Sequence, residues 1–111
     1  MKQFFGKYRG TVTSNLDPLQ RGRILATVPD VLGQHATGWA LPCLPYAGNG
    51  VGLFFVPPIG ALVWIEFERG DSDYPIWSGC IPDGVSVGSP NQKTIKTHSA
   101  TIIIDDTPGA S

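Results

Sequence analysis

Residues 57–79, PPIGALVWIEFERGDSDYPIWSG, constrain the fold most, because they join two apolar extended runs through an acidic turn. Successive side chains of a strand point to opposite faces, so residues 61–68 divide into two sets. One set is apolar and is expected in the core: Ala61, Val63, Ile65 and Phe67. The other set places Trp64 beside Glu66 and Glu68. A tryptophan beside two carboxylates is typical of the edge of a contact with another chain, so Trp64 is a candidate interface residue.

Composition favours a small all-β domain that is partly covered by partners. The chain has 111 residues, which is enough for one core, and it contains 14 glycines and 10 prolines. These residues separate short runs rich in valine, isoleucine and aromatic residues, a pattern typical of β proteins. Only 15% of the residues are charged, against roughly 25% in ordinary soluble domains. The net charge of -1 and the scattered lysines and arginines disfavour binding to nucleic acid.

The first three quarters of the chain are expected to form six short strands, at residues 5–13, 21–28, 39–44, 52–56, 61–68 and 74–81. The first two flank a turn and are expected to pair as a hairpin, with Ile24 and Val28 in the core. Pro42 confines the third to an edge or a bulge, because proline cannot donate to a ladder. No segment shows helical periodicity. This number and size of strands predicts an all-β fold, a five- to six-stranded OB barrel over residues 1–84.

The composition changes after residue 84. Residues 85–92 are uncharged and rich in glycine and serine, which indicates a linker. Residues 93–111 contain two further extended runs, which predict a short β-hairpin. An isolated hairpin is marginal in water, so this segment is expected to associate with copies of itself. Its candidate trimer-interface residues are Ile95, Ile102, Ile103 and Ile104.

The cysteines and histidines do not suggest a metal or catalytic site. Cys43 and Cys80 lack a CxxC spacing and are expected as buried, reduced thiols, with a disulfide as the alternative. Together with His35 and His98 they form a possible zinc ligand set, but without zinc spacing. Nucleophilic catalysis would need one of these two histidines as a base, and both are expected on the surface. No cofactor, no metal and no enzymatic activity are therefore expected.

Two groups of carboxylates have alternative interpretations. The first group could be a glycosidase-like pair or a cation loop, but a solvated strand edge followed by an Asx turn is favoured. Its members are Glu66, Glu68, Asp71 and Asp73. The second group, Asp105 and Asp106, could pair with a lysine or arginine of a neighbouring protomer. It could equally keep the adjacent isoleucine run soluble.

Two further candidate functional sites are a polar loop and a set of aromatic residues. The loop motif of Asn15, Asp17, Gly22 and Arg23 is explained by turn chemistry with one exposed arginine, Arg23. The aromatic residues could stack on single-stranded nucleic acid, but without flanking cations they are expected in core and protomer contacts. They are Tyr46, Phe54, Phe55, Trp64 and Trp77.

Several motifs resemble one family closely. They are G-x-V-x-x-N-x-D-P-x-x-x-G-R-I at residues 10–24, the pair Trp39 and Ala40, and P-x-x-G-x-x-V-W-I-E-F-E-x-G-D-x-x-x-P-I-W-x-G at residues 57–79. Over residues 5–83 the chain is similar to the OB-fold domain of contractile-tail central spike proteins, namely phage baseplate assembly protein V, phage tail-spike hubs and VgrG-like proteins. Residues 95–109 resemble that family's entry into an intertwined trimeric β-helix or β-prism.

This resemblance implies a structural role. The expected assembly is a homotrimeric spike of a phage tail baseplate or related bacterial injection particle. It would link a tail hub above to a membrane-puncturing tip protein or a β-helix extension below. It would meet the target cell envelope transiently. The chain ends at Ser111 without a long β-helix, a lysozyme domain or an apical His-x-His site. It is therefore either a shortened form or a short spike that another chain completes.

The sequence has no signal peptide and no run of about 18 apolar residues, so assembly in the bacterial cytoplasm is expected. Two other function classes were weighed against the structural role. The alternative is an OB-fold module that binds oligosaccharide or single-stranded nucleic acid, although the basic groove such a module needs is missing. A peptidoglycan hydrolase would have to use Glu66 or Glu68.

Overall fold

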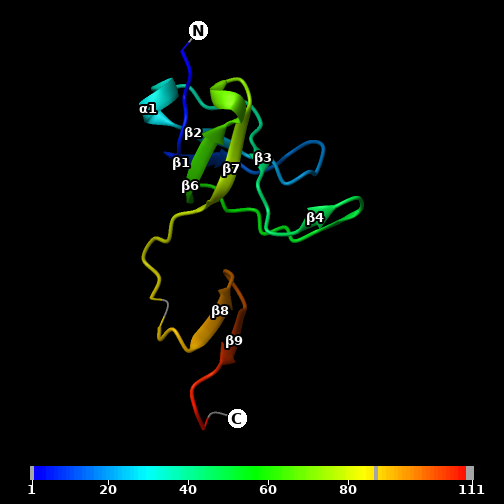
Figure 1. Cartoon of the computed structure of the whole chain (residues 1–111), viewed down its shortest axis with the longest axis vertical. Helices are drawn as coiled ribbons and strands as arrows, with labels where there is room; N and C mark the ends of the chain where they lie inside the picture. The colour runs from blue at the N-terminus through cyan, green and yellow to red at the C-terminus, as the bar shows by residue number, and fades with distance from the viewer. Residues whose placement is uncertain (1, 87, 110–111) are drawn as a thin grey trace.

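The computed structural model describes residues 2–86 and 88–109 (Figure 1). Residues 1, 87, 110 and 111, which fall within the predicted barrel, linker and C-terminal segment, lie outside the described residues. The elements in chain order are β1 (Tyr8–Ser14), β2 (Leu25–Thr27), α1 (Pro29–Leu32), β3 (Leu41–Pro42), β4 (Ala47–Gly48), β5 (Val51–Gly52), β6 (Leu62–Phe67), the 3-10 turn η1 (Glu68–Gly70), β7 (Pro75–Cys80), β8 (Gln92–Lys96) and β9 (Thr101–Asp105).

Five strands form one curled sheet in the order β2-β1-β6-β7-β3. All its pairs are antiparallel except β3 with β7. Register shifts in the β1–β2 and β6–β7 pairs mark bulges, which strengthen the local twist and bend the strands. The two outer edges of the sheet meet, because antiparallel bridges join Ile24 to Ala40 and Thr27 to Ala36. The prediction of an all-β, OB-like domain is confirmed.

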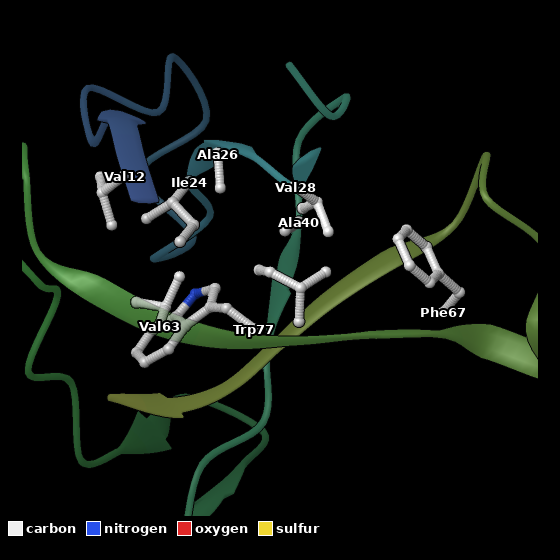
Figure 2. Close-up of a cluster of buried hydrophobic side chains, with 9 residues drawn as sticks. Val12, Ile24, Ala26, Val28, Ala40, Val63, Phe67 and Trp77 are labelled. Carbon is white, nitrogen blue, oxygen red and sulfur yellow. The ribbon is translucent and has the colours of Figure 1, made fainter. Parts of the chain in front are cut away.

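The curled sheet encloses a single core, which Figure 2 shows. Burial alternates along β6, where every second residue is buried. The buried hydrophobic residues are Val12, Ile24, Ala26, Val28, Ala40, Val63, Ile65, Phe67 and Trp77. Gly10 allows β1 to approach this core closely, because a Cβ there would lie 3.0 Å from both Ile65 Cγ1 and the Thr27 carbonyl oxygen. A side chain at residue 10 would therefore require Ile65 or the backbone at Thr27 to shift, which the dense packing of a protein core resists.

The N-terminal segment packs over one end of the barrel. The amide of Phe4 donates to the carbonyl oxygen of Gly70 over 2.8 Å. The ring of Phe4 meets Tyr8 edge-on at 6.2 Å and lies 6.1 Å from Phe67, centroid to centroid. Such tilted and edge-to-face pairs stabilise the contact beyond the area they bury. The N-terminal segment therefore covers this end of the barrel with aromatic side chains.

Three predicted segments differ from the structure. The strand expected at residues 52–56 is absent, since β4 and β5 form a tiny hairpin and the chain then runs irregularly into Pro57 and Pro58. The expected strand at 39–44 shrinks to the two residues of β3, which does lie at a sheet edge. One helical turn, α1, was not predicted. It begins at Pro29, whose fixed φ suits the first turn of a helix.

The molecule is elongated, with the β8–β9 hairpin beyond the barrel and the two ends of the described chain at opposite extremes (Figure 1). Its principal extents are 58 × 31 × 25 Å. Its radius of gyration is 16.2 Å, against about 13 Å for a compact domain of this length. Among the described residues, no helix is long and apolar enough to cross a membrane.

Candidate assembly interface

The β8–β9 hairpin presents an apolar stripe on one face. Its register pairs Lys93 with Ile104, and Ile95 with Ile102. Directly paired residues of an antiparallel ladder share a face, and alternate residues change face. Ile95, Ile102 and Ile104 therefore lie together, while Ile103 points to the opposite face. All four are about half exposed, from 48% to 60%.

The opposite face of the hairpin looks onto the linker. Ile103 and Thr94 line a shallow hollow together with Gly84, Val85 and Ser86. The sequence predicted all four isoleucines as interface residues but could not assign their faces, because this depends on the pairing register. The stripe of Ile95, Ile102 and Ile104 is left about half exposed by the described residues, and so is Ile103 on the other face.

Polar contacts within the hairpin hold its shape. Lys93 Nζ lies 2.9 Å from Asp106 Oδ2, so Asp106 pairs within its own hairpin. Asp105 accepts a hydrogen bond from the Thr107 amide over 2.8 Å, and Thr107, through its side chain and its amide, lowers the pKa of that carboxyl. Thr97 and Ala100 close the turn through their backbones over 2.8 Å. These contacts set the turn and register, but they give the hairpin no core.

Trp64 lies on the outer face of the barrel, where charged residues surround it. Arg9 stacks on its ring, with 5.1 Å from the guanidinium carbon to the ring centroid. Next to this pair, Lys7 Nζ lies 3.3 Å from Glu66 and 3.2 Å from the Ser78 hydroxyl. Trp64 is half-buried by these neighbours. One face of its ring is thus already occupied within the protomer.

The loop between β1 and β2 is organised around a buried ion pair. Asp17 accepts hydrogen bonds from the amides of Leu19, Arg21 and Arg23, and from the Arg23 guanidinium at 2.7 and 3.0 Å. The hydrogen bonds from the Arg23 side chain hold the pKa of Asp17 far below its usual range. Only 18% of the Arg23 side chain is exposed, and it also lies 5.5 Å from the Trp39 ring centroid. The prediction of an exposed arginine was wrong, because buried Asp17 draws it inward.

A second apolar surface, which the sequence predictions missed, is an arm made of β4, β5 and their flanks, residues 46–56. It projects sideways from the barrel (Figure 1). Its register pairs Ala47 with Gly52 and Gly48 with Val51, and the Leu53 amide donates to the Tyr46 carbonyl oxygen. Alternation therefore places Tyr46, Val51 and Leu53 on one face, which we name the arm face. They are 60%, 49% and 44% exposed.

One sequence signal could have revealed this surface. No charged residue and no histidine occurs between His35 and Glu66, and much of this span is exposed in the structure. Such a run does not by itself distinguish an exposed surface from a core, because both are uncharged.

The aromatic residues are dispersed and do not form one platform. Trp77 is in the core, and its indole N–H donates to the Gly22 carbonyl oxygen over 2.9 Å. Phe54 packs over Gly22 and Gly52, where a Cβ would meet its ring. Tyr46 and Phe55 are exposed on the arm and at its base. These aromatic residues therefore do not form one surface on which nucleic-acid bases could stack.

The remaining candidate residues also fall in separate places. Cys43 and Cys80 are free and exposed, so the prediction of buried thiols was wrong: both lie at the ends of strands rather than under the sheet. Asp71 accepts a hydrogen bond from the Asp73 amide over 3.0 Å, which is the predicted Asx turn. His35 and His98 are exposed. Within residues 2–86 and 88–109, no group of three or more His, Cys, Asp or Glu side chains could hold a metal ion.

Comparison with known families matches residues 8–81 to one described as "Type VI secretion system/phage-baseplate injector OB domain". The match covers more than half of the chain and coincides with the barrel. The chain belongs to this family. Its OB domain comprises β1 to β7, and the β8–β9 hairpin lies outside the matched residues.

A curated relative agrees with this assignment. The chain is 41% identical over 46 residues to the "Type VI secretion system spike protein VgrG4b" of Pseudomonas aeruginosa. The matched stretch is 41% of this chain and 5% of that protein. The chain thus spans about a twentieth of the length of the relative, so the similarity concerns a single domain of a much larger spike.

Proposed function

We propose that this chain is a structural subunit of the central spike of a contractile injection apparatus, in a phage baseplate or a type VI-like system. The single observation that carries the proposal is a barrel of the injector OB-domain family joined to a hairpin with an uncovered isoleucine stripe. Three copies would join their hairpins around an axis, each covering the stripe of the next. The role is mechanical and uses no catalytic group.

The proposed organisation divides the chain into the OB domain at residues 1–84, the linker at 85–92 and the trimerising segment at 93–111. The barrel and the β8–β9 hairpin lie at opposite ends of the molecule, which suits a subunit placed in series between two partners (Figure 1). The barrel end would face a hub protein, and the hairpin end a tip protein or β-helix extension. The exposed part of Trp64 would add a contact between neighbouring barrels.

Light scattering of the full chain tests the proposal, with a trimer as the expected mass. The variant Ile102→Asp should dissociate the trimer, because it would bury an unpaired carboxylate within the stripe. Thr101→Asp is a matched control on the neighbouring residue, whose side chain points to the other face. A wild-type chain that stays monomeric at high concentration would refute the proposal. A trimer that tolerates Ile102→Asp would remove the stripe from the interface.

A further inference from the structure

The arm face is apolar and exposed, and it has no partner among the residues that the structure describes. Tyr46, Val51 and Leu53 share this face and are each at least 44% exposed. On the other face of the arm, Phe54 covers Gly52 and rests on Gly22, although about half of Phe54 stays exposed. Contiguous apolar surface of this kind on soluble proteins marks a contact site.

A groove lies at the base of the barrel, on the side of the hairpin. It has a volume of about 820 Å³, and Ile59, Leu62, Cys80, Ile81, Val85 and His98 are among its lining residues. Ile59 and Val85 are 62% and 57% exposed, so the groove is open and largely apolar. We name it the basal groove.

The arm and the groove lie at the same level of the molecule. Phe55 and Val56, which form the base of the arm, line the rim of the basal groove. From this rim the arm runs outward, away from its own barrel (Figure 1). Four extended residues reach about 13 Å. The arm can thus extend past its own groove toward a neighbour.

Symmetry then links the two surfaces. In a cyclic trimer each contact is heterologous, so a patch on one protomer meets a different patch on the next. Rotation about the axis keeps every feature at its own height, so the two patches must lie at one level. This chain offers a protruding apolar surface and a hollow apolar surface that satisfy both conditions. On this basis, and resting on the proposed trimer, we infer that the arm face of each protomer docks in the basal groove of its neighbour.

The charges of the arm and of the groove favour a neighbouring protomer over a membrane as the partner of the arm. Segments that bind membrane surfaces combine apolar residues with lysine or arginine, whereas the arm has no charged residue. The rim of the groove carries Asp83, Lys96 and His98, which offer partners to the hydroxyl of an incoming Tyr46. The contact buries no charge of the arm and brings no like charges together.

The native Cys80 in the groove allows a direct test by cross-linking. In a Cys43→Ser background, Leu53→Cys should form a disulfide with Cys80 of the neighbouring protomer under a mild oxidant. Partial burial raises the pKa of the Cys80 thiol, so the reaction is run at about pH 9 to supply thiolate. Non-reducing gels should show covalent dimers and trimers, which disappear when Cys80→Ser is added.

The matched control is Gln34→Cys in the same background, an exposed site next to α1 at the other end of the barrel. It should not cross-link to Cys80. If light scattering shows a trimer but Leu53→Cys cross-links no more than Gln34→Cys, the arm contact is wrong and the trimer stands. Cross-links that persist with Cys80→Ser would mean that arms meet arms, which also overturns the inference. A monomer in light scattering refutes the trimer and the docking together.

A charge on the arm provides a second measurement. Val51→Asp changes an exposed residue, so the barrel should fold normally, and the trimer should dissociate at a roughly tenfold higher concentration. Gln34→Asp should leave the dissociation midpoint unchanged. Equal midpoints for both variants would exclude the docking, and so would binding of wild-type chain to lipid vesicles that Val51→Asp abolishes.

Discussion

The barrel and the β8–β9 hairpin are both β-structure, but they obtain stability from different sources. The barrel buries nine hydrophobic residues in its own core, and its outer edges meet. In the hairpin every residue of β9 is exposed, and β8 is almost as open. A two-stranded sheet without a covered face is marginal in water. The same chain therefore contains one part with a core of its own and one part that has no core among the described residues.

Separating the two regions tests directly whether they differ in their source of stability. A chain that ends at Gly84 should lose the trimer completely and yet unfold cooperatively as a monomer, because the whole core lies before that residue. Light scattering and thermal denaturation measure the two properties. A shortened chain that fails to fold would show that the barrel also depends on the hairpin.

A core substitution should have the next largest effect and should act on the barrel. Ile65→Ala removes a fully buried side chain, so the free energy of unfolding should fall by about 2–5 kcal/mol. Urea denaturation followed by tryptophan fluorescence measures this loss. Leu19→Ala, at a site 56% exposed, should change the free energy by no more than about 0.5 kcal/mol. Equal losses at the two sites would contradict the assigned core.

The buried Asp17–Arg23 pair makes the stability of the barrel depend on pH. Hydrogen bonds from Arg23 lower the pKa of Asp17 in the folded state, whereas an unfolded aspartate titrates near about pH 3.9. The stabilisation is complete above that value and is lost as the pH falls toward the folded pKa. Asp17→Asn should lower the melting temperature at pH 7, and its deficit should shrink below about pH 4.

Thermal melts across this pH range test the expectation. Asp30→Asn is the control, because Asp30 is exposed and forms no ion pair among the described residues. A deficit of Asp17→Asn that stays constant down to acid pH would mean that the carboxylate stabilises the loop only by its shape.

The smallest effect is expected within the hairpin. The Lys93–Asp106 pair is well exposed on both sides, and such surface pairs contribute about 0–1 kcal/mol. Lys93→Gln should therefore leave the melting temperature of the full chain almost unchanged. A large loss of trimer in this variant would show that the pair, rather than the isoleucine stripe, holds the copies together.

The barrel was predictable from sequence where periodicity and turn residues agree. The alternation at residues 61–68 predicted the buried face of β6, and Pro42 predicted an edge strand. The strand expected at residues 52–56 was wrong because its apolar residues serve an exposed arm, and apolar runs alone do not distinguish the two. The inward turn of Arg23 depends on Asp17, six positions away, and on backbone amides that only the folded loop brings together.

The candidate interface was predictable only in part. Four isoleucines and the absence of a core predict that the hairpin is a contact segment, but the faces of the isoleucines follow from a register that sequence does not determine. The arm escaped prediction because its uncharged residues resemble core residues. Only the exposed fraction of each side chain in the folded structure reveals the arm as a surface.

The junction where the sheet closes on itself also determines where the barrel can open. Between β2 and residues 36–40 the closure consists of two isolated bridges, and the Thr37 hydroxyl accepts a hydrogen bond from Ala26 in place of a backbone carbonyl. The pairs β1–β6 and β6–β7 have four and five residue pairs, respectively. Local opening is therefore expected at this seam before the central strands separate. In the proposed spike, the seam would let a subunit deform under sudden force without losing its fold.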